Sequence, residues 1–276
     1  MRVEGFRAPL VLAVALVVAA APASRAEELR IDLGWDLGLT LGVGGTWILT
    51  EVLKGYLAPD VCHWCAGNAF DDGVRAALRW DDTEAANSTS YVLGVALLPA
   101  LMMGVNAASA RDAGTAVQGA EDLLLVLEAV AFASTLNQAT KFLVGRQRPF
   151  VRARGAEERS SLEGSPDDNL SFFSAHVTLA FAAAVSGATV ATLRGYDTAP
   201  YLWVVGGLMA LGTGYLRIAA DRHYLSDVLV GAAVGALVGW AVPWLHRASL
   251  WDDEAPDDTD RASFRLGPPV SFGMVF

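Results

Sequence analysis

Three clusters of polar residues between positions 141 and 227 have the residue types needed to bind and cleave a phosphate ester. In the first, Lys141 and Arg148 are seven residues apart and Pro149 follows. Seven residues are close to two helical turns, so we expect both cations on one face of a helix that Pro149 ends. The chain has only two lysines, which makes this placement informative. The alternative is anchoring at a membrane boundary, where cations also collect.

The second cluster contains Ser171, Ser174, Ala175 and His176 at the start of an apolar run. Ser171 or Ser174 could cap a helix there, whose free N–H groups and positive dipole end attract an anion. Ser174 adds a hydroxyl donor, and Ala175 is small enough to let the backbone approach a ligand. His176 could protonate a departing alkoxide. The alternative is a histidine that only caps the helix or faces solvent.

The third cluster contains Arg217, His223 and Asp227. On a helix, the spacing of four places Asp227 beside the His223 ring, where it fixes the tautomer and leaves the other nitrogen free to attack. Arg217 could neutralise charge that builds up on a phosphoryl group. A structural histidine–aspartate hydrogen bond with an arginine at the membrane boundary is the alternative. Together, the clusters predict an anion site with a nucleophile and an acid.

In this order the clusters resemble the signature of the type 2 phosphatidic acid phosphatase (PAP2) superfamily, which includes bacterial class A acid phosphatases and vanadium haloperoxidases. That signature is lysine, six residues, Arg-Pro; then Pro-Ser-Gly-His; then Ser-Arg, five residues, His, three residues, Asp. The first and third motifs are met at the family spacing by Lys141-x6-Arg148-Pro149 and Arg217-x5-His223-x3-Asp227. The resemblance covers about residues 120–246.

Three positions depart from the signature. Phe173 and Ala175 replace its proline and glycine, and Leu216 replaces its serine. None of these changes removes a catalytic side chain. The Ala175 methyl restricts φ, and Leu216 lacks a hydroxyl that could contact phosphate. A slower enzyme, or a catalytically degenerate bundle that binds phosphate lipids, are therefore alternatives to a full phosphatase.

The resemblance implies a metal-independent phosphatase that hydrolyses a lipid phosphate or pyrophosphate. His223 would be the nucleophile that forms a phosphohistidine, Asp227 would orient it, and His176 would protonate the leaving alcohol and then activate water. The phosphoryl oxygens would be bound by Lys141, Arg148, Ser174, Ala175 and Arg217. Because these groups supply positive charge, no metal or cofactor is expected. A haloperoxidase with vanadate in the phosphate position is a rival, disfavoured by the apolar helices and by the lack of a long soluble N-terminal half.

Cys62 and Cys65 are the only cysteines in the chain. Their spacing fits half of a zinc site, but no second pair exists to complete it. A thioredoxin-like couple is a further alternative, although no alternating strands and helices surround the pair. We favour a disulfide in an exported loop.

The composition indicates a membrane protein. The chain is 53% hydrophobic and 18% charged, with a mean hydropathy of +0.37, which is too apolar for an ordinary soluble enzyme. A net charge of −10 disfavours nucleic acid as a partner. The expected partners are a lipid phosphate and the membrane, and no obligate protein partner is inferred.

We expect an all-α, six-helix membrane-associated bundle of the PAP2/haloperoxidase type. A short amphipathic helix at 68–80 precedes the core of the bundle. Glu128, Asn137 and Gln138 would make hydrogen bonds inside it or line the pocket. The loop 150–169 could form a lid or simply be solvated. The predicted helices are 36–56, 90–107, 116–145, 174–193, 200–219 and 226–246.

Three regions follow from the sequence. Residues 1–26 read as a signal peptide or signal anchor, 27–250 as the PAP2-type domain, and 251–276 as an acidic, flexible tail. The chain would lie in a bacterial inner membrane with the active site facing the periplasm, since Arg111, Arg194 and Arg247 fall in the opposite loops. A soluble periplasmic bundle is the alternative.

One conflict concerns the predicted helix 36–56. A cleaved signal and a full crossing by that helix would put the active site inside the cell. Because Asp36, Glu51 and Lys54 interrupt its apolar surface, we expect it to pack at the periplasmic side without crossing completely.

Overall fold

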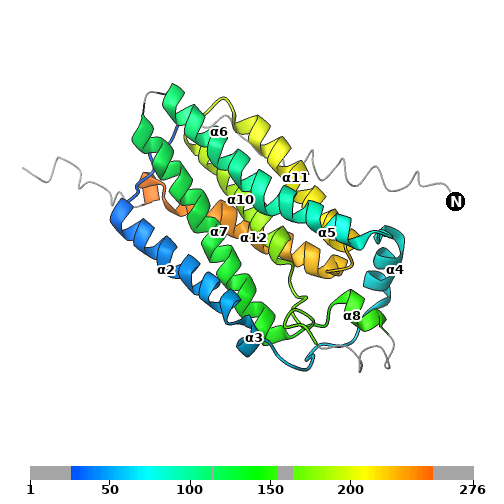
Figure 1. Cartoon of the computed structure of the whole chain (residues 1–276). Helices are drawn as coiled ribbons and strands as arrows, with labels where there is room; N and C mark the ends of the chain where they lie inside the picture. The colour runs from blue at the N-terminus through cyan, green and yellow to red at the C-terminus, as the bar shows by residue number, and fades with distance from the viewer. Residues whose placement is uncertain (1–25, 114, 155–163, 251–276) are drawn as a thin grey trace, which may run out of the picture.

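The computed structural model describes residues 26–113, 115–154 and 164–250 (Figure 1). The proposed signal at 1–26, apart from Ala26, and the tail at 251–276 lie outside this part, as does the middle of the expected lid loop. The described residues form helices and, outside them, only isolated bridges between Leu29 and Arg247 and between Trp64 and Arg146. The all-α prediction is confirmed.

Six long helical segments form the bundle. They are α2 (Leu33–Val52), the continuous run of α5 (Thr83–Tyr91), η1 (Val92–Leu97) and α6 (Leu98–Asp112), α7 (Ala116–Val144), α10 (Ala175–Leu193), α11 (Ala199–Ala219) and α12 (Leu225–Leu245). Shorter helices are α3 (Lys54–Leu57), α4 (Ala69–Leu78), α8 (Pro149–Ala153) and the 3-10 turn η2 (Ala248–Leu250). The expected count of six is therefore not exact, because short helices in the connections add to it.

The second long helix begins earlier than the apolar run predicts. Asp82 caps it, with its carboxylate accepting a hydrogen bond from the Ala85 N–H at 2.9 Å. This cap lets the polar stretch from Thr83 to Ser90 stay helical, and a π-helical turn at Val92–Leu97 joins it to the apolar half. The expected amphipathic helix is α4, capped by Asn68 through the Asp71 N–H at 2.8 Å.

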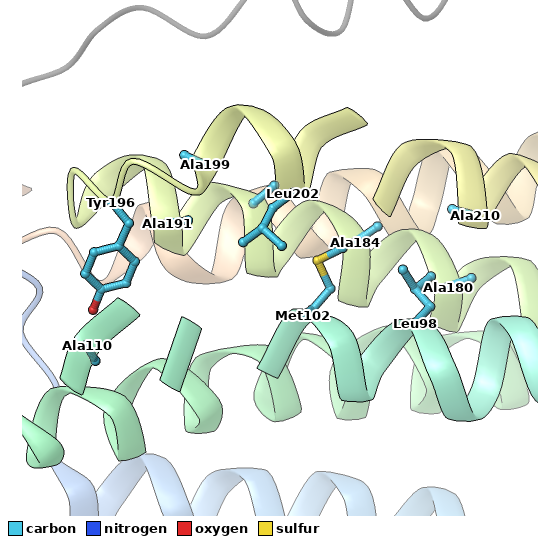
Figure 2. Close-up of a cluster of buried hydrophobic side chains, with 11 residues drawn as sticks. Leu98, Met102, Ala110, Ala180, Ala184, Ala191, Tyr196, Ala199, Leu202 and Ala210 are labelled. Atoms are coloured by element: carbon cyan, nitrogen blue, oxygen red, sulfur yellow. The ribbon is translucent and has the colours of Figure 1, made fainter. Parts of the chain in front are cut away.

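The centre of the bundle is α10, which packs against α6, α7, α11 and α12. Small residues allow close approach: a Cβ at Gly231, Gly235 or Gly239 would lie 2.9, 2.3 or 2.6 Å from backbone oxygens of α10 or its cap. The α12 backbone therefore lies directly on α10. On the other side, Met102 of α6 reaches between α10 and α11, near Ala184 and Leu202 (Figure 2).

Four helical segments are long and apolar enough to cross a membrane: Thr83–Asp112, Ala175–Leu193, Ala199–Ala219 and Leu225–Leu245. Many large apolar side chains also face outward from the bundle, as lipid contact requires. We conclude that this is a membrane protein. Of the remaining long helices, α7 and α2 are held together in part by a hydrogen bond from Thr135 Oγ1 to the Val43 carbonyl at 2.9 Å.

Helix α2 extends along the length of the bundle. Its start lies beside the end of α12, where Leu29 bridges Arg247, and its far end reaches the cavity described below through Trp47 and Glu51. The helix thus runs along α7 from one end of the bundle to the other (Figure 1). Among the described helices it is not one of those long and apolar enough to cross a membrane, so the expectation that it does not cross completely stays a prediction.

Candidate active site

A cavity of ≈ 390 Å³ opens at one end of the bundle. There α7 and α11 end and α10 and α12 begin, so the alternating directions of the helices bring the three polar clusters together. Residues from every cluster line the cavity: Lys141, Arg148, Ala175, His176, Arg217 and His223. Ser174 and Asp227 lie just behind this wall.

The first cluster converges on the cavity by a different route from the predicted one. Helix α7 ends at Val144, Gly145 adopts a left-handed conformation with φ 54°, and Arg148 is the N-cap residue of α8. Lys141 and Arg148 therefore do not share a helix face. Instead, the turn after α7 folds Arg148 back, and Asp167 holds it through a 2.7 Å hydrogen bond from Arg148 Nε to the Asp167 carbonyl.

The second cluster presents free polar atoms at the start of α10. Ser174 occupies the N-cap position but makes no capping hydrogen bond. Within the described part of the chain, Ser174 Oγ and His176 Nε2 are buried and have no hydrogen-bond partner. The His176 ring packs edge-on against Tyr91, with centroids 4.1 Å apart. Buried polar atoms without partners are costly, so this end of α10 is suited to a polar ligand.

The third cluster differs from the expected helical pair. His223 lies in the turn before α12, and Asp227 is in the first turn of that helix. His223 Nδ1 is 2.8 Å from the Ser171 carbonyl and 3.6 Å from Asp227 Oδ2. A carbonyl only accepts hydrogen bonds, so Nδ1 must carry the proton and Nε2 the lone pair. One tautomer of His223 is therefore favoured, as predicted. The acceptor that fixes it, however, is the Ser171 carbonyl, while the Asp227 carboxylate lies farther from the ring.

The surroundings of His223 keep its ring neutral. Burial lowers the pKa of His223 well below its usual value, and the nearby Arg148, Arg217 and Lys141 cations lower it further, while the Ser171 carbonyl opposes this only in part. At Asp167, burial and the cations act in opposite directions. Burial raises the pKa of Asp167, but Arg148, Lys54 and Lys141 outweigh that effect and leave it lowered.

Arg146 is a buried residue that the sequence reasoning missed. Its guanidinium donates to Asp227 Oδ1, to Ser226 Oγ at 2.7 Å and to Asp71 Oδ2 at 2.8 Å. Trp64 and Tyr224 cover its two faces, each ring centroid 4.1 Å from the guanidinium carbon. Arg146 thus ties α4 to the start of α12 and fixes Asp227. Its place inside the six-residue spacer of the first motif gave no signal of this role.

The disulfide between Cys62 and Cys65 supports the same network. The structure joins the two residues covalently, as favoured from the sequence. Trp64 lies inside this small loop and stacks on Arg146, while its backbone accepts a hydrogen bond from Gln147 N at 3.1 Å. The disulfide loop therefore covers the buried arginine from outside the bundle.

Arg217 is positioned by residues of α5, a segment to which the sequence assigned no role in the site. Its Nη1 donates to Asn87 Oδ1 at 2.7 Å and to Ser90 Oγ at 2.9 Å, and its Nε is buried without a partner among the described residues. The Nη1 edge of the guanidinium therefore positions the side chain, and the Nε edge has no hydrogen-bond partner among the described residues. The polar run ahead of the apolar part of that helix was the signal that could have revealed these partners.

The fold and the site define a helical membrane protein with a cationic, two-histidine pocket at one end. The model of the PAP2 superfamily matches residues 122–251, which contain all three clusters. Over this segment, which is just under half of its length, the chain matches the PAP2 superfamily.

Two known proteins are similar to this chain. A lipid A 1-phosphatase from Porphyromonas gingivalis is 43% identical over 75 residues, which are 27% of this chain but only 16% of that protein. The crystal structure of a transmembrane PAP2-type phosphatidylglycerolphosphate phosphatase from Bacillus subtilis matches with a TM-score of 0.50 and 18% identity, over 78% of this chain and 99% of that one. At that identity the likeness shows the fold.

Proposed function

We propose that this protein is a phosphatase that hydrolyses a lipid phosphate or pyrophosphate through a phosphohistidine intermediate, without a catalytic metal. The observation that carries the proposal is the convergence of two imidazoles and three cations on one cavity. A tetrahedral dianion needs such charge, and its ester needs a nucleophile and an acid.

The chemistry assigned to each group follows from its position. His223 Nε2 attacks phosphorus while the bond to the alcohol oxygen breaks, and His176 gives that oxygen a proton. Lys141, Arg148 and Arg217 stabilise the charge that spreads over the remaining phosphoryl oxygens. Water then attacks the phosphohistidine, with His176 taking its proton, and the bond between nitrogen and phosphorus breaks. Inorganic phosphate is released, and His223 returns to its neutral form.

The surroundings of the cavity support a lipid substrate. Apolar residues line it beside the cations: Trp47, Val95, Leu170 and Leu179. Two of these, Val95 and Leu179, belong to segments that are long and apolar enough to cross a membrane. A headgroup phosphate in the pocket could therefore remain attached to chains in the bilayer. Both similar proteins described above are lipid phosphatases by name, which supports the same class.

The test uses the full chain in detergent with a panel of lipid phosphates, measuring phosphate release and trapping labelled protein with a radioactive phosphate donor. We expect His223→Ala to lose at least about a thousandfold in kcat and to trap no label. His176→Ala should lose about 10²–10⁴ with lipid substrates. With para-nitrophenyl phosphate, whose leaving group needs no acid, the His176→Ala variant should accumulate as the labelled phosphohistidine form.

His63→Ala is the control, since it also removes an imidazole but lies exposed outside the cavity. It should retain wild-type turnover, and chelator should leave the wild type active at low temperature. Full turnover by His223→Ala, or a wild type that needs added metal for each turnover, would refute the mechanism. Halide oxidation with added vanadate, without phosphate release, would assign the pocket to peroxidase chemistry.

A further inference from the structure

A second cluster of chemically active side chains lies away from the phosphate cavity. It consists of Asp36 near the start of α2, Glu128 in α7 and His246 at the end of α12. One ligand atom from each residue lies within 4.8 Å of the other two. None of the three residues lines the cavity, so the proposed phosphatase chemistry does not use them.

In this cluster, nitrogen and oxygen atoms with free lone pairs lie close to one another. His246 Nδ1 lies 2.8 Å from the Val242 carbonyl and must donate to it, which leaves the Nε2 lone pair available. That nitrogen is 3.7 Å from Asp36 Oδ1 and 3.9 Å from Glu128 Oε2. Glu128 is 3% exposed, and within the described part of the chain its Oε2 has no hydrogen-bond partner. A carbonyl on the second ring nitrogen is the usual support of a metal-binding histidine.

Charge is also unbalanced at this point. Asp36 and Glu128 are both buried, and among the described residues no lysine or arginine forms an ion pair with either. Two arginines near this end have other partners: Arg194 pairs with Glu121 and Asp122, and Arg247 pairs with Glu27. Two carboxylates in one buried site require a counter-charge or protons.

We propose that Asp36, Glu128 and His246 form a structural site for a divalent transition metal ion of the Zn²⁺ class. One imidazole and two carboxylates suit such an ion, whereas Mg²⁺ and Ca²⁺ take oxygen ligands alone. Tetrahedral donors around zinc are about 3.4 Å apart. The two histidine–carboxylate separations, 3.7 and 3.9 Å, exceed this value by only a few tenths of an ångström, and the ligand atoms of Asp36 and Glu128 lie within 4.8 Å of each other. The His246 side chain is 15% exposed, so we expect water to reach the ion as a fourth ligand.

The ion would join three helices. It would fix the start of α2 to α7 and α12, while the far end of α2 contributes Trp47 and Glu51 to the phosphate cavity. Losing the ion should therefore loosen α2 and lower thermal stability without removing any group that acts on phosphate. This separates the site from the proposed catalytic mechanism, and either proposal can fail without the other.

The experiment measures metal binding directly. Full-length protein in detergent is stripped with chelator, dialysed against Zn²⁺, and analysed by mass spectrometry for metal per chain, with thermal unfolding of the same samples. Co²⁺ substitution reports the ligand geometry through its visible spectrum. We expect about one bound ion per chain in the wild type and a thermal midpoint that rises with Zn²⁺. Glu128→Gln and His246→Gln should each weaken binding at least about tenfold.

Glu28→Gln is the matched control, because it removes an exposed carboxylate at the same end of the bundle. It should bind Zn²⁺ as the wild type does. Asp36→Asn provides a third ligand variant if either of the others fails to fold. Wild-type protein that binds no Zn²⁺ at millimolar concentration would overturn the proposal and indicate a protonated carboxyl cluster instead. So would ligand variants that bind as tightly as Glu28→Gln.

Discussion

His223 shows how single residues set the chemistry of the pocket. A histidine with an ordinary pKa near 6.5 would lose most of its neutral form between pH 7 and pH 5. Burial and the Arg148, Arg217 and Lys141 cations lower the pKa of His223, so its neutral, nucleophilic form persists as the pH falls. The cations that we propose to hold phosphate thus also keep the proposed nucleophile unprotonated.

The pH dependence of kcat/KM tests this, because that ratio reports ionisations of the free enzyme. After correction for the second ionisation of the phosphate ester, we expect kcat/KM to fall less than about threefold from pH 7 to pH 5. An ordinary histidine would give a fall of about twentyfold. Arg148→Gln removes one of the lowering charges and should move the acid limb to higher pH. Identical acid limbs in the two proteins would contradict this account.

The sequence identified these residues through their spacing but not through their contacts. Lys141, Arg148, Arg217, His176 and His223 were all expected in one site and all line the cavity. Spacing alone could not show that the Ser171 carbonyl is the acceptor for His223, because any residue can supply a carbonyl. It also could not show that Arg146 holds Asp227, since that depends on Asp71 from a distant helix.

At the scale of helices, the glycines of α12 place the start of that helix beside α10. A Cβ added at Gly235 would lie 2.3 Å from the Thr178 carbonyl oxygen, which is too close for any side chain. We expect Gly235→Ala to push the helices apart and to destabilise the protein by about 1–3 kcal/mol. Activity should also fall, because His223 and Ser174 lie on the two helices' adjoining ends.

Gly207→Ala is the control for this prediction. It makes the same substitution in an apolar helix, where a Cβ would meet nothing within 4 Å. It should keep wild-type activity and gain up to about 1 kcal/mol from helix propensity. Thermal unfolding and turnover of the two variants, in the same detergent, provide the comparison. Equal thermal midpoints would mean that close packing at Gly235 does not hold the site.

The helices themselves were largely predictable, since long apolar runs bounded by polar residues define them. The predicted segments 174–193, 200–219 and 226–246 match α10, α11 and α12 within a residue at each end. The early start at Thr83 was not predictable from hydropathy, because that stretch is polar and is helical through the Asp82 cap and its contacts with α11. Those contacts arise only after folding.

Across the whole molecule, the proposed phosphate cavity and the proposed metal cluster lie toward opposite ends of the bundle. The cavity lies where α10 and α12 begin, and Arg111, Arg194 and Arg247 lie at the other end with the start of α2. From the positive-inside rule we expect those arginines in the cytoplasm and the cavity in the periplasm. An export signal in 1–26 would instead carry the start of α2 outside. The arginines and the export signal therefore predict opposite orientations of the chain in the membrane.

We expect the arginines to decide the orientation, and cysteine labelling tests it. Asp81 at the cavity end and Asp112 at the opposite end are both exposed, so Asp81→Cys and Asp112→Cys form a matched pair. The native Cys62 and Cys65 are joined in a disulfide and should not react. In intact Gram-negative cells with a permeabilised outer membrane, an impermeant maleimide should label Asp81→Cys at once and Asp112→Cys only after lysis. The reverse pattern would place the cavity in the cytoplasm, with residue 27 exported and the substrate in the inner leaflet.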